Sequence, residues 1–183
     1  MTAINLKDFC ANPESDDREV LCHPFTKGEW SYGTNGHLLL RVPRNEAICA
    51  EFPRDKWGDV FELLDTLSAQ KLELQPLPYY GECPEDEENN CGKCMGMAVI
   101  DGDCDECGGE GVLYAPVSVD LFGKPFAYRY IKKIQAFPNI CGKLVPSPNG
   151  GPDMLFFSFD GGEGALMPRD RPAPRHFSPI PLS

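Results

Sequence analysis

Four cysteines stand in two closely spaced pairs near the middle of the chain. Two residues separate Cys91 from Cys94, and the same spacing recurs between Cys104 and Cys107. Each Cys-x-x-Cys turn presents two thiolates to one metal ion, and two such turns complete the tetrahedral sulfur shell that zinc prefers. A single pair would equally suit a redox dithiol. The duplicated spacing predicts one structural Zn²⁺ held by Cys91, Cys94, Cys104 and Cys107, with Cys83 as a spare thiol.

The segment around these cysteines is too polar to fold unaided. Residues 81–110 contain ten acidic residues and one lysine, and so carry −9 of the chain's net charge of −11. A short segment with few core-forming residues needs a staple, and a zinc ion supplies one. The alternative is a set of free thiols in an acidic loop. The rest of the 183 residues is nearly neutral, so overall acidity does not exclude a local basic surface.

The residues after the cysteine pairs carry a first resemblance. The second pair continues as Cys104-Asp-Glu-Cys107-Gly-Gly-Glu-Gly111, and the first matches the same pattern as far as Gly96. This resembles the zinc-binding repeats of DnaJ-type chaperones, in which glycines let the backbone turn around the metal. The chain has no His-Pro-Asp motif, so a whole chaperone is not implied. The resemblance implies a zinc-dependent protein-binding module of chaperone or adaptor type, with no role on DNA.

A second resemblance covers more of the chain. The run Thr34-Asn-Gly-His37-Leu-Leu, within Trp30–Val42, resembles the Thr-Asp-Gly-His hairpin of bacterial DNA polymerase III beta sliding clamps. Residues Leu155–Pro168, which end in Met-Pro, resemble the closing strands of a clamp domain, and Phe126–Ile134 resembles the helix before them. The resemblance implies an accessory or interaction protein of DNA replication, from a phage or another mobile element.

The resemblance also implies an organisation of the chain. Residues 1–43 and 116–168 would form one discontinuous clamp-like domain of antiparallel sheet with two or three helices, an α+β fold. Residues 44–115 would be an insertion that carries a helix and, at about 83–111, the zinc knuckle. Residues 169–183 are rich in proline and are expected to form a tail.

Local patterns predict most of the elements of this domain. Asn35-Gly36 between two extended runs is a strong hairpin signal, and apolar residues at helical spacing predict the helix Asp55–Gln70. A second helix is expected over Pro125–Phe137, ended by Pro138. The expected strands are Val20–Phe25, Glu29–Thr34, His37–Val42, Leu72–Leu77, Val112–Leu121, Lys143–Pro146, Met154–Asp160 and Gly164–Met167.

The second helix carries three bases on one face. Arg129, Lys132 and Lys133 lie at i, i+3 and i+4, which are neighbouring positions on a helix surface. They are candidates for weak contacts with DNA phosphates, although a helix packed by one face also exposes charge for solvation alone. Three cations are fewer than non-specific DNA binding usually recruits.

Signatures of catalysis are missing from the sequence. The three histidines, His23, His37 and His176, stand apart, and no nucleophile elbow, phosphate loop or dinucleotide fingerprint occurs. We therefore expect a non-enzymatic protein without a small-molecule substrate, which binds a protein partner or associates with itself. The first residues lack the apolar centre of a signal peptide and no apolar run reaches membrane length, which predicts a cytoplasmic protein with no membrane contact.

Overall fold

The computed structural model describes residues 4–14, 16, 18–48, 50, 58–70, 72–80, 87–90, 112–115, 117–147, 150–170 and 175–177. Its helices and mainly antiparallel sheets form an α+β fold, as expected. The chain divides into two compact units. The first comprises Met1–Leu77 with Ile134–Pro168, and the second comprises Pro78–Lys133 with Arg169–Ser183.

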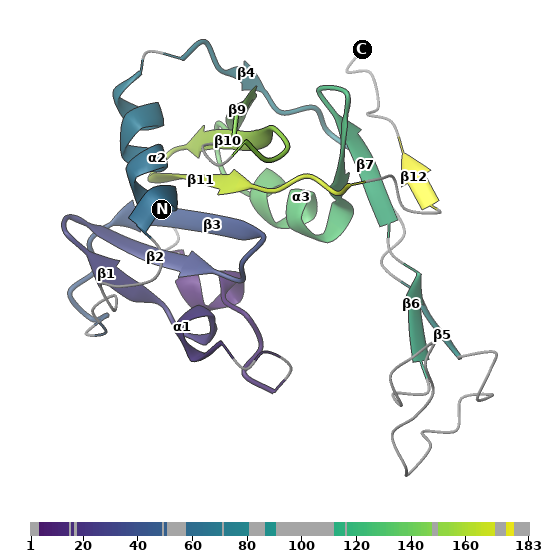
Figure 1. Cartoon of the computed structure of the whole chain (residues 1–183), viewed down its shortest axis with the longest axis horizontal. Helices are drawn as coiled ribbons and strands as arrows, with labels where there is room; N and C mark the ends of the chain where they lie inside the picture. Colours follow the sequence, from purple (N-terminus) through teal and green to yellow (C-terminus); the bar gives the residue numbers. More distant parts are fainter. Residues whose placement is uncertain are drawn as a thin grey trace. The chain divides into compact units, whose positions relative to one another are not determined.

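The first unit is built on a seven-stranded antiparallel sheet (Figure 1). The strand order is β1-β2-β3-β11-β10-β9-β4. Strands β1–β3 form one antiparallel meander and β9–β11 a second, and the two meanders are joined by pairing of β3 with β11. The strands are β1 (Phe25–Lys27), β2 (Trp30–Thr34), β3 (Leu38–Pro43), β4 (Gln75–Pro76), β9 (Cys141–Val145), β10 (Met154–Phe159) and β11 (Gly162–Leu166).

The turn between β2 and β3 confirms the hairpin predicted from Asn35-Gly36. The Asn35 Oδ1 atom accepts hydrogen bonds from the backbone N–H groups of His37 and Leu38, each at 3.0 Å. Gly36 has a φ of +87°, a conformation that costs little without a Cβ atom. The first strand expected in this meander is wrong, because Val20–Phe25 is not one strand.

A helical turn, α1 (Glu19–Cys22), precedes β1. Leu21 and Cys22 are consecutive and both buried, which fits a helical turn as well as a strand that is covered on both faces. The N–H of Leu21 donates to the carbonyl of Arg18 at 2.8 Å and closes the turn.

Both faces of the large sheet are covered. The helix α2 (Gly58–Ala69) packs on one face through Phe61, Leu64 and Leu67, which confirms the expected helix over the residues described. A 3₁₀ helix, Leu6–Phe9, lies on the opposite face, where the Leu6 carbonyl sits so close to Gly33 that a Cβ atom would lie 2.4 Å from its oxygen. Because both faces of the sheet are covered, polar as well as apolar residues of its strands are buried.

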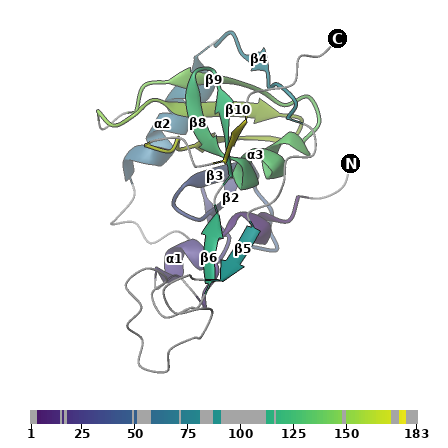
Figure 2. The same ribbon diagram turned by 90° about the vertical axis from the view of Figure 1, so that its right-hand side faces the viewer.

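The second unit contains a three-stranded and a two-stranded sheet. In the first, β7 (Val117–Leu121) pairs antiparallel with β8 (Lys124–Ala127) and parallel with β12 (Arg175–Phe177). In the second, β5 (Glu87–Asn90) and β6 (Val112–Ala115) form a hairpin (Figure 2).

The helix α3 (Tyr128–Gln135) follows β8 and begins later than expected. Pro125 and Phe126 belong to β8, where they pair with Asp120 and Val119 of β7. Among the described residues, no helix has the length and apolar content needed to cross a membrane.

Candidate functional site

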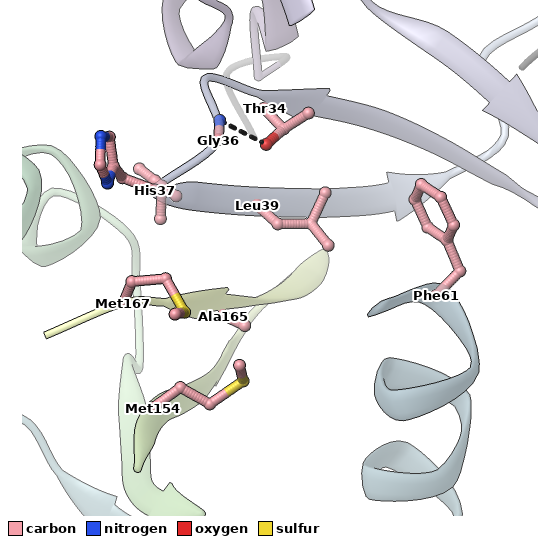
Figure 3. Close-up of a pocket in the computed structure, with 9 residues that line it drawn as sticks. Thr34, Gly36, His37, Leu39, Phe61, Met154, Ala165 and Met167 are labelled. Carbon is pink, nitrogen blue, oxygen red and sulfur yellow. Dashed lines mark hydrogen bonds between the residues drawn. The ribbon is translucent and has the colours of Figure 1, made fainter. Parts of the chain in front are cut away.

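An apolar pocket lies on the α2 face of the large sheet, next to the β2–β3 turn (Figure 3). Its volume is about 90 Å³. Strands β3, β10 and β11 form the floor, and the turn and α2 form the sides. Nine residues line it: Thr34, Gly36, His37, Leu38, Leu39, Phe61, Met154, Ala165 and Met167.

Strand register explains why these residues meet. Leu39 is the direct neighbour of Thr34 on β2 and of Ala165 on β11, so the three side chains share one face. Met167 follows β11, and its N–H donates to the His37 carbonyl at 2.9 Å, which ties the closing segment to the turn. Phe61 reaches the pocket from α2 (Figure 3).

The pocket opens at the β2–β3 turn, where Gly36 and His37 are exposed. The Gly36 N–H donates to the Thr34 hydroxyl at 3.2 Å, which pairs these two polar groups at the rim. The His37 ring points away from Phe61 and the two methionines (Figure 3). Among the lining residues that the structure describes, His37 is the titratable one and lies at the rim, so the pocket suits binding of an apolar group.

A buried ion cluster lies on the same sheet face, two residues along the strands from the pocket. Arg41 on β3 is 1% exposed and stands directly between Tyr32 on β2 and Glu163 on β11. Its Nε atom donates to Glu163 Oε1 at 2.7 Å, and its Nη2 atom also contacts that carboxylate. The ring of Trp30 covers the guanidinium at 4.5 Å.

Helix α2 supplies the remaining partners of the cluster. Arg41 Nη1 donates to Asp65 Oδ1 at 2.5 Å, and the Ser68 hydroxyl donates to Glu163 Oε2 at 2.9 Å. Burial lowers the pKa of Arg41, but hydrogen bonds with Asp65, Tyr32 and Glu163 outweigh burial and leave that pKa raised. Burial raises the pKa of Tyr32, against the opposing effect of Arg41. Arg41 is therefore permanently charged and Tyr32 stays neutral at physiological pH.

The predicted zinc ligands Cys91, Cys94, Cys104 and Cys107, and the spare Cys83, lie outside the described residues. Within the described part of the chain, no three His, Cys, Asp or Glu side chains lie together as a metal site would require. Cys10, Cys22 and Cys141 are described, and these three form no disulfide.

The predicted basic face lies on α3 as expected, since Arg129, Lys132 and Lys133 are all exposed. Arg129 Nη2 donates to the Tyr130 hydroxyl at 3.2 Å, and its guanidinium lies 4.9 Å from that ring. Arg129 therefore has a structural contact besides any contact with a ligand.

Sequence reasoning selected the segments that line the pocket but missed the pocket itself. The clamp resemblance pointed to Trp30–Val42 and Leu155–Pro168, which supply seven of these nine residues. The other two are Phe61 and Met154, and Met154 lies just before the second segment. Arg41 and Glu163 were also missed. The available signal was a charged residue inside each of two otherwise apolar strands.

Comparison with known proteins gives this chain no relative, because no family model, curated protein or solved structure matches it.

Proposed function

We propose that this chain is a non-enzymatic interaction protein whose pocket receives one aliphatic side chain of a partner polypeptide. The observation that most directly supports this proposal is the pocket of about 90 Å³ between the β2–β3 turn and the segment that ends at Met167. An engineered apolar cavity of about 150 Å³ holds a benzene molecule, so a space of this size suits a single leucine- or methionine-sized group.

A replication role for this interaction rests on the sliding-clamp resemblance. The residues Thr34, Gly36 and His37, which carry that resemblance in the first meander, lie at the pocket, and so does Met167 from the closing segment. The resemblance and the geometry thus point to the same surface. The partner we propose is a replication protein that presents an extended segment with an exposed aliphatic residue.

A zinc knuckle formed by Cys91, Cys94, Cys104 and Cys107 is the second part of this proposal. It is supported by the paired spacing alone. The knuckle would stabilise the acidic segment, whose charge of −9 repels DNA and favours a protein neighbour.

A library of random peptides displayed on phage tests the pocket directly. Selection on the wild-type protein should enrich peptides that share a leucine, isoleucine or methionine at one position. Ala165→Leu adds three carbon atoms inside the pocket and should weaken these peptides about 30- to 150-fold, the equivalent of about 2–3 kcal/mol for burying one aliphatic side chain.

Lys143→Ala is the matched control, because Lys143 is exposed on β9 of the same sheet and does not line the pocket. Circular dichroism checks that each variant is folded. Selected peptides that bind Ala165→Leu as tightly as wild type would refute the proposal.

A further inference from the structure

Among the α2 side chains that the structure describes, Phe61 lines the pocket, so the position of this helix affects how large the pocket is. Apolar contacts of Phe61, Leu64 and Leu67 hold α2 on the sheet. The hydrophobic attraction between such residues is non-directional. The edge-on packing of the Phe61 ring against Phe25 and Tyr32, at 5.8 and 4.9 Å, adds a geometric preference at one end of the helix. Hydrogen bonds to charged groups, in contrast, fix distance and angle within narrow limits.

Two such bonds connect α2 to the sheet. Asp65 binds Arg41 at 2.5 Å and Ser68 binds Glu163 at 2.9 Å. Phe61, Asp65 and Ser68 are spaced at i, i+4 and i+7, so they lie along one stripe of the helix. The same stripe that forms the pocket wall is therefore the one that is fixed to the strands.

Stability alone is a poor explanation for this arrangement. A buried ion pair usually contributes no more stability than well-packed apolar residues of the same volume, and its best-attested use is to fix the registry of packed elements. Arg41 is 1% exposed, in the middle of an apolar sheet face. The two α2 residues that bind this pair are exposed, in contrast to Arg41: the side chain of Asp65 is 64% exposed, and Ser68 is exposed too.

We propose that Asp65 and Ser68 are positioning residues, which lock α2 to the Arg41–Glu163 pair and so set the pocket to admit an aliphatic side chain and exclude a large aromatic one. This inference rests on the proposed function, because it concerns the selectivity of the same pocket. It assigns a role to two exposed polar residues that do not line the pocket themselves.

The test variant is Asp65→Ala with Ser68→Ala. Both side chains are exposed and alanine favours helix, so the variant keeps the fold and the Arg41–Glu163 pair while losing both bonds from α2. Glu62→Ala with Thr66→Ala is the matched control, since these two residues are exposed at nearby positions of the same helix and line no part of the pocket.

The first readout needs no ligand. Protein labelled at its methionine methyl groups reports on Met154 and Met167, which line the pocket together with the Phe61 ring. In the Asp65/Ser68 variant their NMR signals should broaden or split, because α2 takes more than one position. They should stay as in wild type in the control variant.

The second readout is binding of two capped amino acids, N-acetyl-leucinamide and N-acetyl-tryptophanamide, followed by the same methyl signals. Wild type should favour the leucine compound by about tenfold or more, and the variant should bind the two within about twofold of each other. Unchanged methyl signals in the variant, or equal changes in the control, would overturn the positioning role. If neither compound binds wild type while the variant's methyl signals still change, the lock stands and the proposed function fails.

Discussion

Removing Glu163 alone should destabilise the first unit strongly, because it leaves the buried Arg41 charge without the one of its two carboxylate partners that is itself nearly buried. The Glu163 side chain is 11% exposed and that of Arg41 1%, so water replaces little of the lost contact. Breaking a buried ion pair in this way typically costs about 3–5 kcal/mol. For a chain of this length each kcal/mol shifts the melting temperature by about 2–4 °C, so Glu163→Leu should lower it by roughly 6–20 °C.

Removing the three buried members of the cluster together should cost far less than removing Glu163 alone. In Tyr32→Phe/Arg41→Met/Glu163→Leu neither a buried charge nor the buried Tyr32 hydroxyl is left without a partner. Replacement of complete buried ion pairs by apolar residues is often neutral or stabilising by about 1–4 kcal/mol. The triple variant should therefore be at least as stable as wild type, and much more stable than Glu163→Leu.

Urea unfolding, followed by tryptophan fluorescence to which Trp30 beside Arg41 contributes, measures these differences. Glu46→Leu is the matched control, because the Arg44–Glu46 pair is exposed and should change stability by no more than about 0.5 kcal/mol. A triple variant as unstable as Glu163→Leu would show that shape, and not a stranded charge, causes the loss. A cost of about 1 kcal/mol or less for Glu163→Leu would refute the buried pair itself.

Three further outcomes are expected. Protein purified without added zinc should contain about one equivalent of the metal. The double variant Cys91→Ser with Cys107→Ser should lose this zinc, and retained zinc would contradict the ligand set. Removing the zinc with a chelator should expose Pro84–Gly111 to proteases before the rest of the chain. The wild type should bind duplex DNA at low salt, with a slope of about −3 when the logarithm of the binding constant is plotted against the logarithm of the salt concentration. Replacing Arg129, Lys132 and Lys133 with glutamate should abolish this binding, and a wild type that binds no DNA at low salt would contradict the prediction. NMR titration should give Asp16 a pKa of about 2, lowered by hydrogen bonds from Arg18, and Arg18→Ala should return that pKa toward 3.8. The stabilising effect of this pair is fully present above the ordinary aspartate pKa of 3.8, and it is lost as pH falls through about 2.

Local elements were predictable from the sequence where one short pattern determines them. The Asn35-Gly36 turn needs only its two residues, and the apolar spacing of α2 needs only the helical period. The boundary of α3 was harder, because Pro125 fits the first turn of a helix and also the beginning of an edge strand. Pairing of β8 with β7 decided between the two. The turn at Leu21 and Cys22 was missed because an apolar run this short fits a strand and a helical turn alike.

The candidate site was not predictable, because it depends on pairing between distant strands. Arg41 and Glu163 are 122 positions apart, and only the β3–β11 register makes them neighbours. In isolation, alternation along β3 assigns the face with Arg41 to solvent, as in a sheet covered on one side. Here α2 covers that face, and its Asp65 and the opposing Glu163 supply the charges that make burial of Arg41 tolerable.

The pocket and the ion cluster together favour a function for this face of the sheet. The pocket of about 90 Å³ is open at the β2–β3 turn, and a larger residue than Ala165 would fill it. The buried Arg41–Glu163 pair is no more stabilising than apolar residues would be. In a sheet optimised for stability alone, larger apolar residues would replace both the pocket and the ion pair. Here the two features lie side by side under one helix. Departures from the most stable arrangement are expected where a protein binds something, and α2 with its Phe61 wall is where this chain concentrates them.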